Sequence, residues 1–228
     1  MELIDALRTT GSVRQFNDVT VDDEVVYAIL DDARFAPSGG NRQAWHVIVV
    51  RDPDVRRAVR DLYLDAWHDY VAHWLAGLVP FSPLASEADR ANALDHRGKA
   101  IALSDPSGFP ETLDAVPVML VVCADLDLLA ATDRDLDRYQ LVGGASIYPF
   151  VWSIMLAAHD RGLGAGMTTM ATRNEPRLRE VLQVPGSYAV AAVVAMGFVD
   201  ARATKLTRQS VEEFTTIDSM EGTAFRAD

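Results

Sequence analysis

Three segments of the chain carry runs of apolar residues that predict buried β-strands. They lie at residues 46–50, 116–123 and 188–198, and the first of them reads HVIVV. The apolar residues in these runs are continuous rather than alternating with polar ones, which is typical of strands covered on both faces. The pattern therefore predicts a sheet with helices packed against each of its two faces.

Apolar residues at helical spacing predict the helices of these outer layers. The predicted helices cover residues 2–9, a segment from a capping box at Thr20 and Asp23 to about residue 35, a segment from Asp52-Pro53 to about residue 78, residues 143–160, and a segment capped by Asn174 that runs to about residue 183. Helices and strands alternate irregularly along the chain. The sequence therefore predicts the α+β class.

Two segments do not fit this pattern of sheet and helices. Residues 79–112 contain several prolines around a charged helical piece, and residues 200–228 have no apolar core of their own. Long irregular insertions in compact domains are often lids or binding loops. We therefore interpret residues 1–228 as a single domain with a lid-like insertion at about 79–112 and a tail from about residue 200 that lies along another surface.

Aromatic residues gather just before the insertion and at its start. They are Tyr63, Trp67, Tyr70, Trp74 and Phe81. At helical spacing such residues are more often part of a core, but beside a proline-rich insertion they could form a lid that stacks on a planar substrate. Both interpretations stay open on the sequence alone.

The net charge of −12 argues against general binding to nucleic acids or anionic membranes. No run of about 18 apolar residues predicts a membrane span, and the polar N-terminus is unlike a signal peptide. Cys123 is the only cysteine, and the five histidines lack the spacing of a metal site, so neither a disulfide nor a catalytic metal is expected. A reducing, cytoplasmic setting fits this composition.

The glycines of GLGAG at residues 162–166 do not fit a dinucleotide-binding loop. Such a loop joins a strand to a helix, whereas here a predicted helix precedes the glycines and a strand-like TTM follows them. We interpret the glycines as the end of a helix, with Gly162 or Gly164 in left-handed geometry.

Basic and hydroxyl residues occur near both ends of the chain. The N-terminal segment contains Arg8, Ser12 and Arg14, and the C-terminal segment contains Lys205 and Arg208. Taken singly, each basic residue is typical of a solvated surface. Together they suit a terminal phosphate group, which favours charged and bidentate donors. The spacing in the sequence does not by itself bring positions 14 and 208 together.

Four motifs, in their order along the chain, resemble those of the nitroreductase family of FMN flavoproteins. They are SVRQF from residue 12, APSGGNRQAW from residue 36, GLGAGMTTM from residue 162 and KLTRQSVEEF from residue 205. The resemblance implies a three-layer α/β/α sandwich with a central mixed sheet. It also implies a homodimer with exchanged termini, in which two FMN molecules lie at the interface and the tail wraps the partner chain.

The resemblance assigns roles toward FMN to individual residues. Those implied to bind the phosphate are Arg8, Ser12, Arg14, Lys205 and Arg208. Thr10 and Gly11 stand where the family commonly has two basic residues, so phosphate binding would depend more on Arg8. Those implied to contact the ring or ribityl chain are Ser38, Gly39 and Asn41, from the other subunit, and Thr168 and Thr169, near the flavin N5 and O4 atoms.

The activity implied by the resemblance is electron transfer from NADH or NADPH, through bound FMN, to a nitroaromatic or quinone-like acceptor by a ping-pong mechanism. The chemistry would take place on FMN, with a small planar aromatic substrate and no catalytic side chain. Three alternatives stay open: a dehalogenase of iodotyrosine type, a flavin-fragmenting enzyme, and a non-catalytic flavin-binding protein. Glu87, Tyr70 and Lys99 are the candidates to bind a zwitterionic amino acid in the first alternative.

Overall fold

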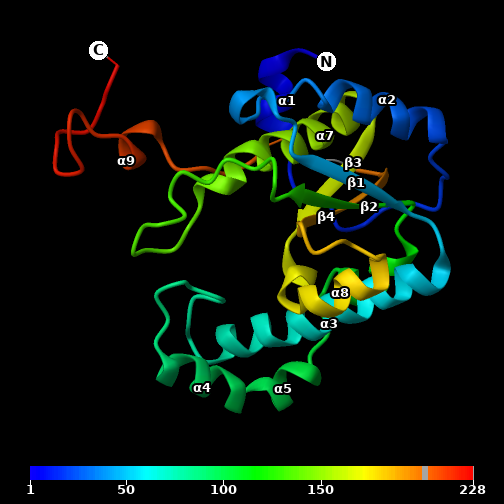
Figure 1. Ribbon diagram of the computed structural model, residues 1–228, viewed down its shortest axis with the longest axis horizontal. Helices are drawn as coiled ribbons and strands as arrows, with labels where there is room; N and C mark the ends of the chain where they lie inside the picture. The colour runs from blue at the N-terminus through cyan, green and yellow to red at the C-terminus, as the bar shows by residue number, and fades with distance from the viewer. Residues whose placement is uncertain (202–204, 228) are drawn as a thin grey trace.

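The computed structural model describes residues 1–201 and 205–227 and contains a four-stranded sheet (Figure 1). The strands are β1 (Trp45–Val50), β2 (Val118–Asp125), β3 (Leu163–Thr168) and β4 (Tyr188–Phe198), in the order β1-β2-β4-β3. The strands expected from the three apolar runs are confirmed. The fourth strand, β3, includes Gly164 and Gly166, which the sequence pattern assigned to the end of a helix. The left-handed geometry expected at Gly162 or Gly164 is found at Gly162, with a φ of 87°, just before β3.

The expectation of a mixed sheet needs a correction, because each neighbouring pair of strands in the described sheet is antiparallel. The parallel contact is a single bridge between Ser12 and Ala165, beside β3 and outside the named strands. In this bridge the Val13 amide donates to the Ala165 carbonyl at 2.9 Å. The segment before residue 14 therefore lies along the edge of the sheet.

Helices cover both faces of the sheet, and alternate residues of β2 show which layer each face meets. Leu120 and Val122 face a core formed with α2 (Asp23–Ala33) and α7 (Tyr148–Asp160), whereas Met119 and Val121 face a core formed with α3 (Pro53–Leu75) and α8 (Glu175–Leu182). Figure 1 shows α2 and α7 on one side of the strands and α3 and α8 on the other. The three-layer α+β architecture is confirmed.

The remaining helices belong to the ends of the chain, the insertion and short connections. They are α1 (Leu3–Thr9), α4 (Glu87–Asp95), α5 (Arg97–Ile101), α6 (Phe109–Thr112), α9 (Val211–Phe214), and the 3-10 turns η1 (Gly39–Asn41), η2 (Leu113–Ala115), η3 (Val142–Ser146) and η4 (Met170–Asn174). The insertion packs along α3, away from the sheet, and α9 lies apart from the rest of the chain (Figure 1).

One of the three expected helix caps has the expected hydrogen bonds. Asp52 caps α3, accepting from the amides of Asp54 at 2.8 Å and Val55 at 3.1 Å. The capping box at Thr20 and Asp23 is wrong, because Asp22 holds the N-cap position without a side-chain bond. The Asp23 carboxylate instead pairs with Arg51 at 2.5 Å, and such a pair with a neighbouring segment cannot be read from local spacing.

Asn174 holds the N-cap position of α8, but its side chain does not cap the helix. The side-chain amide donates to the Leu62 carbonyl at 3.0 Å and to the Asp65 carboxylate at 3.1 Å, and both acceptors belong to α3. The helix start was therefore predicted correctly, but the side chain of Asn174 joins α8 to α3.

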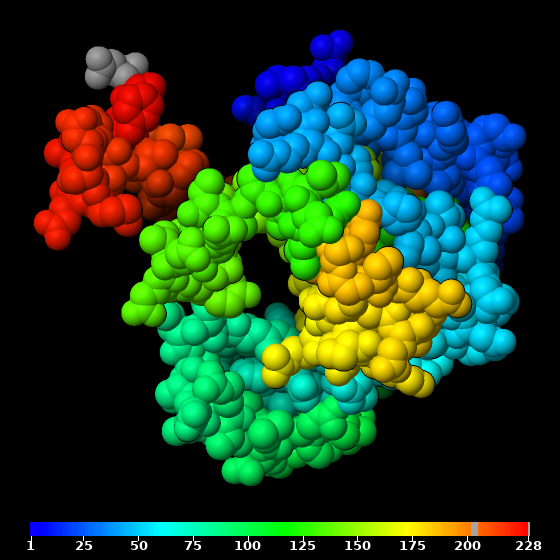
Figure 2. All heavy atoms as spheres, viewed as in Figure 1, coloured from blue at the N-terminus to red at the C-terminus, as the bar shows by residue number. Residues whose placement is uncertain are grey.

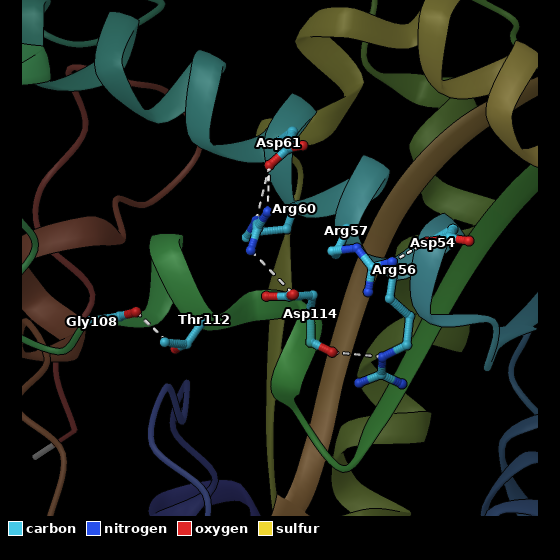
Figure 3. Close-up of polar contacts among 8 residues, drawn as sticks. All are labelled: Asp54, Arg56, Arg57, Arg60, Asp61, Gly108, Thr112 and Asp114. Atoms are coloured by element: carbon cyan, nitrogen blue, oxygen red, sulfur yellow. Dashed lines mark hydrogen bonds and ion pairs between the residues drawn. The ribbon is translucent and has the colours of Figure 1, made fainter.

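Arg56 of α3 joins the outer helical layer to the sheet. Its guanidinium donates to the carbonyls of Asp114 at 2.7 Å, Val50 at 3.1 Å and Val116, at the end of β1 and just before β2. Figure 3 shows Arg56 turned toward the Asp114 carbonyl, while its neighbour Arg57 pairs with Asp54 of its own helix. Burial lowers the pKa of the Arg56 guanidinium, because the charge is partly removed from water.

In the described part of the chain, one helical segment, Val142–Asp160, is long and apolar enough to pass a length-and-composition test for a membrane span. This corrects the expectation that no segment would do so. The α7 part of the segment places Val151 and Ile154 fully inside the core beside the sheet. A core helix passes the same test, so its apolar composition follows from packing against the sheet.

Candidate functional site

A cavity of about 410 Å³ brings together residues from both ends of the chain. Ser12, Arg14 and Arg208 line it, together with residues of α7 and β3. We call it the basic cavity, because the charged side chains that line it among the described residues are Arg14 and Arg208, with no carboxylate. The convergence of positions 14 and 208, which the sequence could not establish, is a property of the fold.

Close approaches at two glycines explain how these segments meet. A Cβ atom at Gly166 would lie 2.4 Å from the Val13 carbonyl oxygen, and one at Gly11 would lie 3.2 Å from a methyl group of Leu206. A contact of 2.4 Å is far shorter than a carbon atom and an oxygen atom tolerate. The N-terminal segment can therefore lie against β3, and Leu206 can close over Gly11 and carry Arg208 to the cavity.

The Thr10 hydroxyl is the clearest sign that the basic cavity suits a ligand. Thr10 is 5% exposed and lines the cavity, and its Oγ1 atom has no hydrogen-bond partner among the described residues. An unpaired buried hydroxyl costs about 1–3 kcal/mol, so a ligand that pairs with it is stabilised. A phosphate group, with several acceptor oxygens and negative charge, matches this hydroxyl and the two guanidinium groups.

His159 contributes a hydrogen-bonded ring to the same cavity. The Thr9 hydroxyl donates to the Asp5 carbonyl at 2.7 Å and lies 2.9 Å from His159 Nε2. The Thr9 hydroxyl has one proton, so it accepts from the ring when it donates to Asp5 and His159 carries its proton on Nε2.

Arg8 and Lys205 do not line the basic cavity, and both are exposed. Their roles toward a phosphate stay predictions. Sequence reasoning treated Thr10 only as the loss of a basic residue. Its burial depends on contacts with distant segments, and no local pattern signals it.

The turn at residues 38–43 is stabilised by its own hydrogen bonds. The Ser38 hydroxyl accepts from the Gln43 amide at 3.0 Å, and the Gly39 amide donates to the buried Ser146 hydroxyl at 3.0 Å. Gly40, Asn41 and Gln43 have positive φ angles of 62°, 51° and 50°, a conformation that costs energy at the two non-glycine residues. The turn is held in a defined shape that leaves the Asn41 side chain exposed.

This turn does not line the basic cavity of the same chain. The indole ring of Trp45, which follows it, stacks on Phe150 with 4.5 Å between ring centroids and 1° between planes. Trp45 thus fixes the turn to α7. The assignment of Ser38, Gly39 and Asn41 to a site in the other subunit stays a prediction. Their separation from the basic cavity of their own chain is compatible with it.

Thr168 and Thr169 lie at the end of β3, facing different surroundings. The Thr168 hydroxyl accepts from the Met170 amide at 3.2 Å. It also interacts with the buried Tyr63, whose pKa is raised to about 12 by burial, with Arg14 and Thr168 acting in the opposite direction. Arg14, which lines the basic cavity, therefore also interacts electrostatically with Tyr63 of α3.

Thr169 lines a second cavity of about 930 Å³, which we call the lid cavity. Its walls come from the C-terminal part of α3, the insertion with Phe81 and Arg90, Tyr139, and η4 with Arg173. Figure 2 shows a hollow between the insertion (teal), the segment before α7 (yellow-green) and the segment after β3 (yellow). The cavity is large enough to hold a substrate of several rings.

The structure separates the aromatic residues that the sequence left undecided. Tyr63 and Trp67 are 5% and 8% exposed and belong to the core, whereas Tyr70 and Phe81 line the lid cavity. Trp74 is 66% exposed and lines neither cavity. The core interpretation therefore holds for Tyr63 and Trp67, and the position of Tyr70 and Phe81 is compatible with the lid interpretation.

No group of three or more His, Cys, Asp or Glu side chains suited to a metal ion occurs within residues 1–201 and 205–227. Together, the three-layer fold and the basic cavity define an α+β protein with a site suited to an anionic ligand at the edge of its sheet. The sequence pattern of the family described as "Nitroreductase family" matches residues 7–198. The chain belongs to the nitroreductase family.

Three similar proteins illustrate the range of this likeness. A nitrobenzene nitroreductase of Ectopseudomonas oleovorans is 27% identical over 223 residues, covering 93% of this chain and 95% of that protein. Among solved structures, iodotyrosine deiodinase bound to FMN and 3-iodo-L-tyrosine has a TM-score of 0.64 and 18% identity, covering 92% of this chain and 96% of that chain. The NADPH:FMN oxidoreductase of Vibrio harveyi complexed with NAD+ has a TM-score of 0.59 and 16% identity, covering 90% of this chain and 72% of that chain.

Proposed function

We propose that the protein is an FMN-dependent oxidoreductase that transfers electrons from NADH or NADPH to nitroaromatic or quinone-like acceptors. The observation that carries the proposal is that Ser12, Arg14 and Arg208 line one cavity with the Thr10 hydroxyl, which has no partner among the described residues, in a chain of the nitroreductase family. Relatives with nitrobenzene nitroreductase and NADPH:FMN oxidoreductase activities support the reaction class. When bound, FMN would supply the electron transfer, in a ping-pong mechanism in which the nicotinamide and the acceptor occupy the same site in turn.

The residues of this chain would hold FMN and orient it. Arg14 and Arg208 would bind the phosphate as charged donors, with the hydroxyls of Ser12 and Thr10 as further hydrogen-bond partners. Thr168 and Thr169, at the end of β3, would place hydroxyl and amide donors at the edge of the ring, where they favour added negative charge. Catalysis therefore requires no acid–base pair of side chains.

Exposed apolar residues at both ends of the chain support a homodimer. Leu3 and Ile4 of α1 are 66% and 57% exposed, and Phe214 and Met220 of the tail are 63% and 93% exposed. Figure 1 shows α9 away from the rest of the chain. A second copy would cover these exposed residues and would bring Ser38, Gly39 and Asn41 to the site of its neighbour.

Dehalogenation of iodotyrosine type is a second candidate, supported by the likeness to iodotyrosine deiodinase. Of the three side chains that could bind a zwitterionic amino acid, Tyr70 lines the lid cavity, whereas Glu87 and Lys99 do not. This arrangement favours nitro or quinone reduction over amino-acid dehalogenation. The flavin-fragmenting and non-catalytic alternatives differ from the proposal in having no external electron acceptor.

Anaerobic titration of the FMN-bound protein with NADH and NADPH tests the proposal, followed by turnover with a nitroaromatic, a quinone and an iodophenol. We expect bleaching of the flavin absorbance by a nicotinamide and turnover with the first two acceptors. Protein that is colourless and monomeric, and that does not bind added FMN, would disprove the proposal. Flavin that binds but is not reduced would identify a non-catalytic flavin-binding protein instead.

A further inference from the structure

Two arginines from different elements line the lid cavity. Arg90 belongs to α4 of the insertion, and Arg173 belongs to η4, which follows β3. The guanidinium of Arg173 lies over the Phe81 ring at 5.4 Å from its centroid, and Arg90 donates to the Ala85 carbonyl at 2.8 Å. Aromatic and cationic groups therefore share the walls of one cavity.

Neither Arg90 nor Arg173 forms an ion pair with a carboxylate in the part of the chain that the structure describes. This is unusual here, because the chain has 33 acidic against 21 basic residues and many of its other arginines are paired. Within residues 1–201 and 205–227, Asp69 is the one carboxylate that lines the cavity, and it accepts from Arg97 at 2.6 Å. The cavity thus presents two guanidinium groups that form no ion pair with its walls, although Arg90 interacts electrostatically with its neighbour Asp89, which does not line the cavity.

The aromatic part of the wall is held in a defined position. Phe81 has a positive φ of 54°, which is costly for a bulky residue, and its ring lies 5.1 Å from His73 and 6.5 Å from Tyr70, between centroids. Such strain at a ligand cavity is typical of a residue held for function. A planar aromatic ligand could stack in this cavity, with a negative group directed at the guanidinium groups.

Thr169 connects the lid cavity to the site proposed for FMN, because it lines the cavity and follows the last residue of β3. We propose that the lid cavity selects electron acceptors that combine an aromatic ring with an anionic group such as a carboxylate, and that Arg173 and Arg90 bind that group. The inference rests on the proposed function and adds the chemical class of the acceptor to it.

A pair of acceptors of nearly the same shape tests this proposal: 4-nitrobenzoate, which is anionic, and 4-nitrobenzamide, which is neutral. We expect the wild-type protein to have the higher kcat/KM with 4-nitrobenzoate. In Arg173→Gln and Arg90→Gln, this preference should fall about tenfold or more, the loss typical of a charge-assisted hydrogen bond. Arg177→Gln is the control, because Arg177 is exposed, pairs with Glu180 and does not line the cavity.

A preference that is absent in the wild type, or that persists in both variants, would overturn the proposal. The same is true if Arg173→Gln raises KM for NADPH relative to NADH and leaves the preference between acceptors intact, because the arginine would then bind the 2′-phosphate on the adenosine ribose of NADPH. Calorimetry measures the binding of each acceptor without turnover, so it tests the anion-binding site separately from the proposed oxidoreductase activity. If 4-nitrobenzoate binds in a way that depends on Arg173 but is not turned over, the anion-binding site would be supported and the proposed oxidoreductase function would be disproved.

Discussion

Gly166 of β3 lies directly against the Val13 carbonyl, so closely that a Cβ atom at position 166 would be 2.4 Å from that oxygen. Val13 stands between Ser12 and Arg14, which line the basic cavity. The absence of one side chain in β3 therefore determines where both residues lie. The position of the cavity therefore depends on Gly166, although Gly166 does not line it.

Gly166→Ala should displace the N-terminal segment from β3. We expect a loss of stability of about 1–3 kcal/mol, as for other overpacked interiors, together with weaker FMN binding. Thermal unfolding and FMN titration would measure the two effects. Gly98→Ala is the control, because a Cβ atom there meets nothing within 4 Å, and in a helix the change should stabilise by about 0.5–1 kcal/mol. Equal FMN affinity in Gly166→Ala and wild type would contradict the link between β3 and the cavity.

Arg14→Ala and Arg208→Ala should each weaken FMN binding by roughly 1.5–3 kcal/mol, because each removes a charged donor to the phosphate. Equilibrium titration of the apoprotein with FMN, followed by fluorescence, measures the change. Riboflavin, which has no phosphate, is the matched ligand control and should lose little affinity in the same variants. If FMN affinity is unchanged in both variants, the phosphate does not bind in the basic cavity.

Thr10→Val should have opposite effects on the apoprotein and on FMN binding. Removing a buried hydroxyl that has no partner among the described residues should leave the apoprotein unchanged or more stable by up to about 1 kcal/mol, while FMN affinity falls roughly threefold to tenfold. Thr112→Val is the comparison, since the Thr112 hydroxyl donates to the Gly108 carbonyl at 2.8 Å. It should lower stability and leave FMN affinity unchanged.

Arg56→Ala should destabilise the fold far more than Arg57→Ala. Arg56 donates to three backbone carbonyls, one at the end of β1 and two just before β2, and their loss should cost about 2–4 kcal/mol. Arg57 forms an exposed pair with Asp54 on the same helix, which contributes under about 1 kcal/mol. Urea unfolding of both apoproteins measures the difference, and equal midpoints would show that Arg56 does not join the two layers.

Cys123 should make stability decrease at high pH. Burial raises the pKa of its thiol from 9.0 to about 11, with Glu175 contributing, so the folded protein keeps this proton where the unfolded chain releases it. In that window the unfolded state binds fewer protons, and the free energy of unfolding falls as pH rises. We expect a smaller fall between pH 9 and 11 in Cys123→Ala. An identical fall in both proteins would show that the thiol does not contribute.

Local patterns were sufficient for three of the four strands and for the main helices. The segments now assigned to β1, β2 and β4 are rich in Val and other apolar residues, and such runs are stable only when both faces are covered. The strand β3 was not predicted, because Gly164, Ala165 and Gly166 have little preference for strands. It is a strand because β4 pairs with it along one edge and Val13 lies against it.

The sequence by itself determined the layered α+β fold and the membership of the nitroreductase family. Both follow from short motifs and from the spacing of apolar residues, which are local properties of the sequence. Only the tertiary structure decided which residues share a cavity. Arg14 and Arg208 meet because glycines allow two distant segments to touch, and Thr10 is buried for the same reason. Close packing between distant segments depends on the whole fold, and no local spacing encodes it.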